Sequence, residues 1–344
     1  MQYRGNRALS RVAILLTALL LPLVSPADEA ARDTSRLNVS IAIFDAGIPA
    51  DRSVHRDQEV FPRVRKIEAL YLPFVLRNVL TSSNEWGAIR VVPGTDKAAE
   101  LLINGTIQRS DGDSLVLRIQ AADASGRIWV DRDFSGIAND QQIYTDIAAA
   151  LSESRALLDD KALRNIVEIS LLRYSQELAP AAFGDYLEQT DSTYSIKRLP
   201  ASNDPMVERI ERLRGVEYVF TDAVDAKFRE LSADVETVYE LWGEYRRQFK
   251  RFQQEESLRT QAGQSQLPRD TYDGMLERYE RYKWDRQAVE EQENWAVGFE
   301  NEMGPTITAI EERVAELEGW VEERYAEWQR ILAELFEVET AMPL

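Results

Sequence analysis

A single row of apolar residues, spaced three or four positions apart from Met206 to Leu335, constrains the fold more than any other feature of this sequence. Side chains at this spacing share one face of a helix, and a row sustained over so many turns is typical of coiled-coil-like helices. The first stretch, about fifty residues at 1.5 Å each, would extend about 75 Å. The polar segment Gly263–Pro268 then interrupts the row. We therefore predict an antiparallel hairpin of two long helices over residues 203–340.

The second helix contains Gly304-Pro305, where we expect a kink or a break because proline lacks the amide that a helix needs. Aromatic residues on the apolar row are expected to pack between the two helices. The row includes Met206, Ile210, Leu213, Phe220, Val224, Phe228, Leu231, Val235, Val238, Trp242, Tyr245, Phe249 and Phe252 before the turn, and Met275, Tyr279, Tyr282, Val289, Phe299, Ile307, Leu317 and Leu335 after it.

Residues 35–158 have a different pattern, in which short alternating runs are separated by turn residues. Alternation with period two predicts strands at 37–44, 88–92, 98–107, 115–121 and 127–134, and helical spacing predicts helices at 60–82 and 141–158. The order βαβββ(β)α, followed by the long hairpin, defines an α+β fold. We expect residues 35–158 to fold alone, with short helices and a linker over 159–202.

The first 27 residues have the features of a secretory signal peptide. Three arginines precede the apolar run at 12–24, and Ser25 and Ala27 supply the small residues of a cleavage site. We expect cleavage after about Ala27, although an uncleaved anchor remains an alternative. No later segment is apolar enough to span a membrane, and an exported chain without cysteine fits the bacterial periplasm.

The run Ala99-Glu100-Leu101-Leu102-Ile103-Asn104-Gly105-Thr106-Ile107, the strand at 115–121 and the turn Asp123-Ala124-Ser125-Gly126-Arg127 resemble the N-terminal domain of the TolB family. They are also similar to αβ modules of curli-secretion and penicillin-binding-protein-activator lipoproteins. The resemblance covers about a third of the chain and implies an envelope protein that assembles through protein contacts. The whole chain resembles exported proteins of proteobacteria. It lacks the lipoprotein cysteine and the propeller repeats of TolB.

Composition excludes much familiar chemistry. The chain has 344 residues, no cysteine and one histidine, so disulfides, thiolate catalysis, cysteine-ligated zinc and histidine-rich metal sites are excluded. The net charge of −18 opposes binding to nucleic acid. We therefore predict no cofactor, no metal and no catalytic residue.

Two short motifs have both a chemical and a structural interpretation. His55-Arg56-Asp57 matches part of a kinase catalytic loop, but the glycine-rich loop and metal-binding motif of kinases are missing, so a loop histidine is the simpler interpretation. Asp111-Gly112-Asp113 could supply calcium ligands, but the other ligands of an EF-hand loop are missing. We predict a β-hairpin turn there.

The candidate partner contacts are Trp284, Trp295, Arg246 and Arg247. Trp284 lies off the apolar row, and an exposed tryptophan is a common anchor in protein interfaces. Arg246 and Arg247 belong to a basic island that also contains Lys250 and Arg251. We interpret the island as a solvated face opposite acidic residues of the second long helix, such as Glu290, Glu291 and Glu293.

These observations favour a non-enzymatic periplasmic scaffold or interaction protein with protein partners in the cell envelope. A homo-oligomer is left open. The alternatives are a module that binds a polymer or small ligand through aromatic residues, and a hydrolase that uses paired carboxylates.

Overall fold

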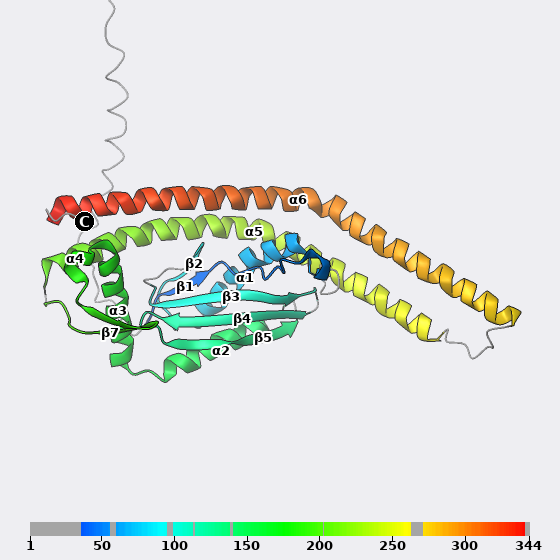
Figure 1. Ribbon diagram of the computed structural model, residues 1–344, viewed down its shortest axis with the longest axis horizontal. Helices are drawn as coiled ribbons and strands as arrows, with labels where there is room; N and C mark the ends of the chain where they lie inside the picture. Colours follow the sequence, from blue (N-terminus) through cyan, green and yellow to red (C-terminus); the bar gives the residue numbers. More distant parts are fainter. Residues whose placement is uncertain are drawn as a thin grey trace, which may run out of the picture. The chain divides into compact units, whose positions relative to one another are not determined.

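A five-stranded sheet forms the centre of the structure, a computed structural model that describes residues 36–340 except 56–59, 95–98, 113, 138–139, 202 and 263–270. Its strand order is β2-β1-β3-β4-β5 (Figure 1). β1 is parallel to β2 and β3, and the other pairs are antiparallel. The strands are β1 (Val39–Ala42), β2 (Ile89–Val92), β3 (Leu101–Ser110), β4 (Ser114–Asp123) and β5 (Ile128–Ile137).

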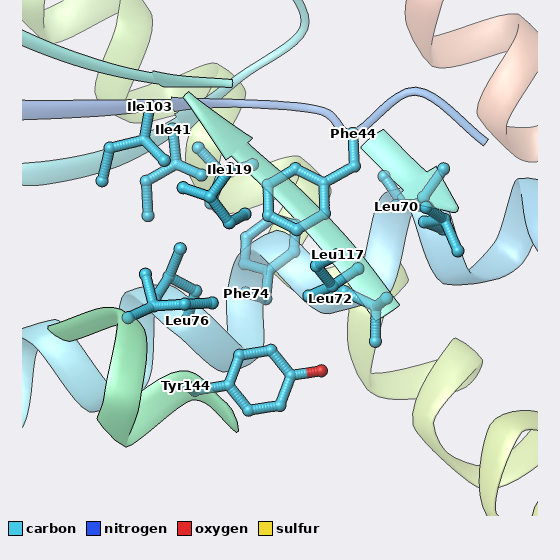
Figure 2. Close-up of a cluster of buried hydrophobic side chains, with 14 of the residues drawn as sticks. Ile41, Phe44, Leu70, Leu72, Phe74, Leu76, Ile103, Leu117, Ile119 and Tyr144 are labelled. Carbon is cyan, nitrogen blue, oxygen red and sulfur yellow. The ribbon is translucent and has the colours of Figure 1, made fainter. Parts of the chain in front are cut away.

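Helices α1 (Pro62–Ser83) and α2 (Gln142–Ala156) pack on one face of this sheet. Alternate residues of β3 and β4, such as Ile103 and Leu117, are buried beneath them because successive side chains of a strand point to opposite faces. Figure 2 shows this cluster with Phe74 and Tyr144. At Gly105 a Cβ would lie 2.5 Å from the Phe44 ring, so only glycine permits this contact. The predicted order of strands and helices, and the α+β class, are confirmed.

A second, smaller core lies around α3 (Asp160–Leu178) and α4 (Pro180–Phe183). It includes a two-stranded hairpin of β6 (Leu187–Thr190) and β7 (Thr193–Ile196), where we predicted an irregular link. These strands have four residues each: β6 carries a single apolar residue, Leu187, and β7 alternates only through Tyr194 and Ile196, so the pattern is too short to distinguish strands from a loop. A short 3₁₀ helix, η1 (Arg52–Val54), completes the elements before α1.

The long hairpin consists of α5 (Pro205–Ala262) and α6 (Tyr272–Thr340), which lie side by side (Figure 1). Phe220 stacks on Trp320 with ring centroids 6.2 Å apart, and Asp234 pairs with Arg313, so the two helices are antiparallel. Asp204 accepts a hydrogen bond from the Met206 amide at 2.9 Å and so caps the start of α5. α6 continues through Pro305 without a break. Within the described residues, no helix is long and apolar enough to cross a membrane.

The proximal part of α5 shares a core with the αβ module. Val224, Phe228 and Val235 of α5 are buried in the same cluster as the sheet and α1. Tyr71 of α1 contacts Tyr239 with ring centroids 5.2 Å apart. The described residues of 36–340 therefore form one compact unit. That residues 35–158 can fold alone stays a prediction. The apolar row of α5 faces the module as well as α6, and periodicity alone cannot distinguish these two partners.

Candidate interaction surface and the contacts that hold the helical arm

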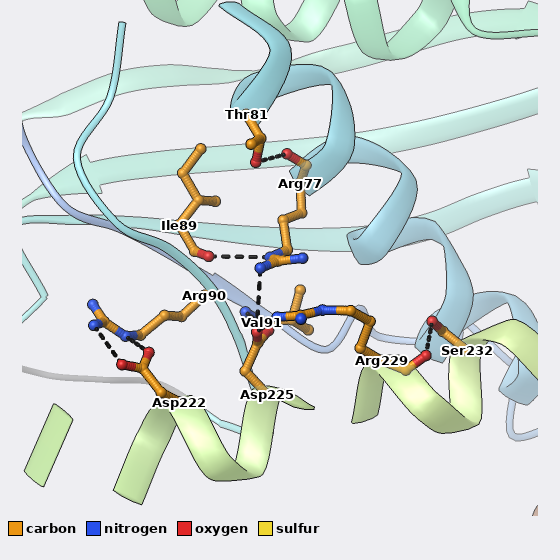
Figure 3. A network of polar contacts seen from close by, with 9 residues as sticks. All are labelled: Arg77, Thr81, Ile89, Arg90, Val91, Asp222, Asp225, Arg229 and Ser232. Carbon is orange, nitrogen blue, oxygen red and sulfur yellow. Dashed lines mark hydrogen bonds and ion pairs between the residues drawn. The ribbon is translucent and has the colours of Figure 1, made fainter. Parts of the chain in front are cut away.

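The outer edge of β2 is occupied by a side chain of α5. The Asp225 carboxylate accepts a hydrogen bond from the Val91 amide at 3.0 Å and pairs with the Arg77 guanidinium at 3.3 Å (Figure 3). Arg229 of α5 pairs with the same carboxylate. Asp225 is buried, and the Arg77 Nε atom donates to the Ile89 carbonyl at 3.1 Å. A free strand edge can pair with another chain, so this contact both fixes α5 and protects the edge.

A second ion pair extends this contact towards solvent. The Arg90 guanidinium donates to both carboxylate oxygens of Asp222, at 2.6 and 3.3 Å. Arg90 also lies over the Tyr218 ring, 4.6 Å from its centroid. Asp222 is exposed, so the Arg90–Asp222 pair is screened by water and contributes less than the buried Asp225 contacts.

Arg246 lies at the far end of the module, where α5 crosses the turn between β3 and β4. Its Nε atom donates to the Asp111 carbonyl at 2.9 Å, and its guanidinium lies 4.8 Å from the Phe61 ring centroid. Gly112 has a φ of +91°, and a Cβ there would lie 2.3 Å from the Arg246 Cβ. The predicted hairpin turn is present. Its glycine is needed because the backbone has a positive φ there and because α5 approaches closely.

These contacts correct our interpretation of the basic island. Arg246 is buried, so it is unavailable to a partner at this surface. Lys250 pairs with the Asp111 carboxylate at 2.9 Å instead of facing the acidic residues of α6. Arg247 is exposed and remains a candidate contact. The sequence did not reveal the pairing because Asp111 and Lys250 are 139 positions apart.

A buried polar cluster lies between α1, the β3–β4 turn and α5. Glu68 is fully buried, accepts a hydrogen bond from Ser110 and lies 3.8 Å from the Arg65 guanidinium. Tyr239 of α5 also hydrogen-bonds to it. Burial raises the pKa of Glu68 to about 7, although Ser110, Arg65 and Tyr239 stabilise the carboxylate. Arg65 and Glu68 were missed in the sequence, where they look like ordinary surface charges of an amphipathic helix.

The cluster is sealed inside the protein. Tyr144 of α2 lies close enough to Glu68 to feel its charge, and it is buried too. A carboxyl group with a pKa near 7 suits general acid catalysis, but a substrate must reach it. Because Glu68 has no exposed surface, we assign the cluster a structural role in joining α5 to the module.

Beyond the Asp111 contact, the hairpin extends past the sheet as a distal arm that contains the beginning of α6 (Figure 1). On this arm, a run of large apolar side chains faces solvent. Tyr272 is 75% exposed, Tyr279 64% and Tyr282 60%. Together with the neighbouring exposed side chains they form what we name the distal stripe: Tyr272, Met275, Leu276, Tyr279, Tyr282, Lys283 and Arg286.

The distal stripe corrects a second expectation. We expected Met275, Tyr279 and Tyr282 to pack against the first long helix, and all three are exposed. A straight helix drifts by about 20° per heptad relative to a 3.5-residue repeat, so a row followed over many heptads changes the face that it marks. Trp284 and Trp295 lie within α6, but their side chains lie outside the described residues.

The structure describes only part of the two short motifs that have a chemical interpretation. A ring nitrogen of His55 lies 2.8 Å from the Pro49 carbonyl oxygen in a loop. Arg56 and Asp57 lie outside the described residues, as does Asp113. In the described part of the chain, no group of three or more acidic or histidine side chains could hold a metal ion.

Comparison with known proteins adds little to these observations. No protein-family model matches the chain, and no curated protein is similar to it in sequence. A solved dodecamer of a PelC variant from Paraburkholderia phytofirmans is similar over 35% of this chain and 90% of that chain, with 12% sequence identity and a TM-score of 0.23. A similarity at this level carries no argument, so the resemblance to the TolB N-terminal domain stays a prediction from the sequence.

Proposed function

We propose that this chain is a non-enzymatic scaffold or interaction protein of the cell envelope, and that its distal arm binds protein partners. The observation that carries the proposal is the distal stripe, where three tyrosines are at least 60% exposed. Tyrosine is enriched at protein interfaces because it combines a large apolar ring with a polar end. A row of such side chains left in water on one helix face marks a surface that a partner covers.

The contacts that anchor the hairpin support separate roles for the αβ module, which holds the arm, and for the distal arm, which binds partners. Asp225 and Arg246 fasten the proximal half of α5 to the sheet and to the β3–β4 turn. The distal stripe lies beyond these anchors, so the module can hold the arm while leaving the stripe accessible. Export through residues 1–27 and a periplasmic location, which the sequence predicts, are part of the same proposal.

Affinity capture from the native envelope tests the proposal. The tagged chain should retain a defined envelope protein, and Tyr279→Glu should abolish this capture by placing a charge at the centre of the stripe. Val219→Glu is the matched control, because Val219 is a 69% exposed apolar residue on the proximal part of α5. Equal capture by both variants would refute a role for the stripe.

An enzyme assay separates the proposal from the hydrolase alternative. We expect the purified protein to show no turnover of glycan or peptide substrates. If it hydrolysed one of them, and a single carboxylate substitution abolished the activity without lowering the melting temperature, the scaffold interpretation would be wrong.

A further inference from the structure

The joint between α5 and the αβ module encloses a carboxyl group that water does not reach while the joint is closed. Glu68 is fully buried where α1, α2, the β3–β4 turn and α5 meet. We infer that docking of the middle of α5 on the module takes up a proton at Glu68, so that the joint is tight in mild acid and loosens as the pH rises through neutrality. This inference does not depend on what the distal arm binds.

The groups next to Glu68 on α1 and the turn stabilise its negative charge incompletely. Ser110 donates a hydrogen bond to the Oε1 atom of Glu68. The Nε atom of Arg65 lies 3.8 Å from the Oε2 atom, beyond hydrogen-bonding distance, and has no hydrogen-bond partner among the described residues. Arg65 donates from its Nη1 atom to the Ile107 carbonyl instead, at 2.9 Å. A carboxylate removed from water needs a full set of such partners, so this site favours the neutral, protonated form.

The charge of Arg65 has a second acidic neighbour. Asp111, buried in the β3–β4 turn, stabilises the Arg65 cation and repels the Glu68 carboxylate. Asp111 itself pairs with Arg109 at 2.8 Å and with Lys250 of α5 at 2.9 Å. The cluster therefore keeps a buried negative charge near Arg65 when Glu68 is neutral.

The groups that face Glu68 from α2 and α5 are phenols. Tyr239 of α5 hydrogen-bonds to Glu68, and Tyr144 of α2 lies close to it. Tyr71 of α1 contacts Tyr239. Burial raises the pKa of all three phenols above the ordinary value of 10, so they stay neutral near pH 7. Glu68 is thus the group of this cluster that titrates close to neutrality, since burial raises its pKa to about 7.

Tyr239 couples this proton to the position of α5. When this part of α5 leaves the module, water reaches Glu68, and its pKa returns towards the ordinary value of 4.5. Between pH 4.5 and about 7, the closed joint therefore holds a proton that the open joint releases. A state that binds fewer protons is favoured as the pH rises, so the open joint gains population.

Native-state hydrogen exchange measures this opening. The amides of α5 at 235–242 are compared with those of the central strand β4 at 117–121, from about pH 5.5 to about 8, after correction for the intrinsic exchange rate. We expect the α5 amides to exchange through an opening that β4 does not share, with an opening constant that increases about twentyfold over this range. Equal protection in the two segments would mean that α5 does not open by itself, and would overturn the inference.

Three variants assign the pH dependence to this cluster. Glu68→Gln cannot ionise, so it should keep α5 protected at alkaline pH. Tyr239 lowers the pKa of Glu68 by hydrogen bonding, so Tyr239→Phe should move the loosening to a higher pH. Glu240→Gln is the matched control, since this neighbouring acid is exposed, and it should exchange as the wild type does. Either Glu68→Gln or Tyr239→Phe with the pH profile of the wild type would overturn the inference.

Infrared spectroscopy locates the proton itself. At about pH 6 exposed carboxyl groups are ionised, so the wild type should retain a band of one protonated carboxyl group that Glu68→Gln lacks. Identical spectra of the two proteins in this region would show that Glu68 is already ionised in the closed joint. The docking of α5 would then take up no proton at Glu68, and the inference would be wrong.

Discussion

The Asp225 carboxylate of α5 accepts a hydrogen bond from the backbone amide of Val91, at 3.0 Å, on the free side of edge strand β2. The two residues are 134 positions apart in the chain. A helix of the hairpin thus supplies a hydrogen-bond acceptor to the free edge of the sheet, and α5 packs on the αβ module.

We predict that Asp225→Ala lowers the free energy of unfolding by about 3 kcal/mol, because the Val91 amide loses its acceptor and Arg77 loses a buried counter-charge. Asp222→Ala is the control, since the exposed Arg90–Asp222 pair should contribute less than about 1 kcal/mol. Urea denaturation monitored by circular dichroism measures both. Similar losses in the two variants would show that the edge contact is no stronger than a surface ion pair.

We predict that Gly112→Ala destabilises the protein by about 1 to 3 kcal/mol, because its φ of +91° disfavours a side chain and the new Cβ would clash with Arg246. Gly94→Ala is a suitable control, since a Cβ there meets no atom within 4 Å. Thermal melting of both variants tests the contact between the β3–β4 turn and α5. An unchanged melting temperature for Gly112→Ala would contradict the close packing.

The regular part of the fold could be predicted from the sequence, whereas the long-range polar contacts could not. Strands β3 and β4 follow from alternation with period two, because each buries alternate residues along most of its length, whereas β1 is buried at all four of its positions. In the sequence, a charged residue that will be buried looks the same as one that will be exposed, because only its partners in the fold differ. This applies to Arg65, Glu68 and Asp225. Those partners lie on distant elements, and helical spacing contains no information about them.

The exposure of the distal stripe could not be predicted from helical spacing either. Periodicity correctly predicted two long antiparallel helices, but it placed Tyr279 and Tyr282 between them. Which face of α6 meets α5 depends on accumulated helix rotation and on where the module ends, and neither can be read from the spacing. The exposed tyrosines became a candidate site only when their exposed fractions were known.

We predict that Leu231→Asp costs several kcal/mol of stability, because it buries an unpaired charge in the core that α5 shares with the sheet. Glu230→Asp, at the adjacent exposed position, should cost little. Thermal melting compares the two variants. Equal melting temperatures would mean that α5 does not pack on the module as described.

The last prediction concerns pH. Burial raises the pKa of Glu68 from 4.5 to about 7, so the folded protein keeps a proton on this carboxyl that the unfolded chain releases near pH 4.5. Between these values the folded state binds more protons, and the free energy of unfolding therefore falls as the pH rises from 4.5 to about 7. The contribution of Glu68 to this fall is about 3 kcal/mol.

Urea denaturation at several pH values compares the wild type with Glu68→Gln, which cannot ionise and should lack this part of the pH dependence. Subtracting the two profiles removes the contribution of the other carboxylates. Ser110→Ala provides a second comparison, because Ser110 lowers the pKa of Glu68 by hydrogen bonding, and its loss should extend the fall in stability above pH 7. Identical profiles for the wild type and Glu68→Gln would show that Glu68 is ionised in the folded protein at acidic pH, with Arg65 as its counter-charge.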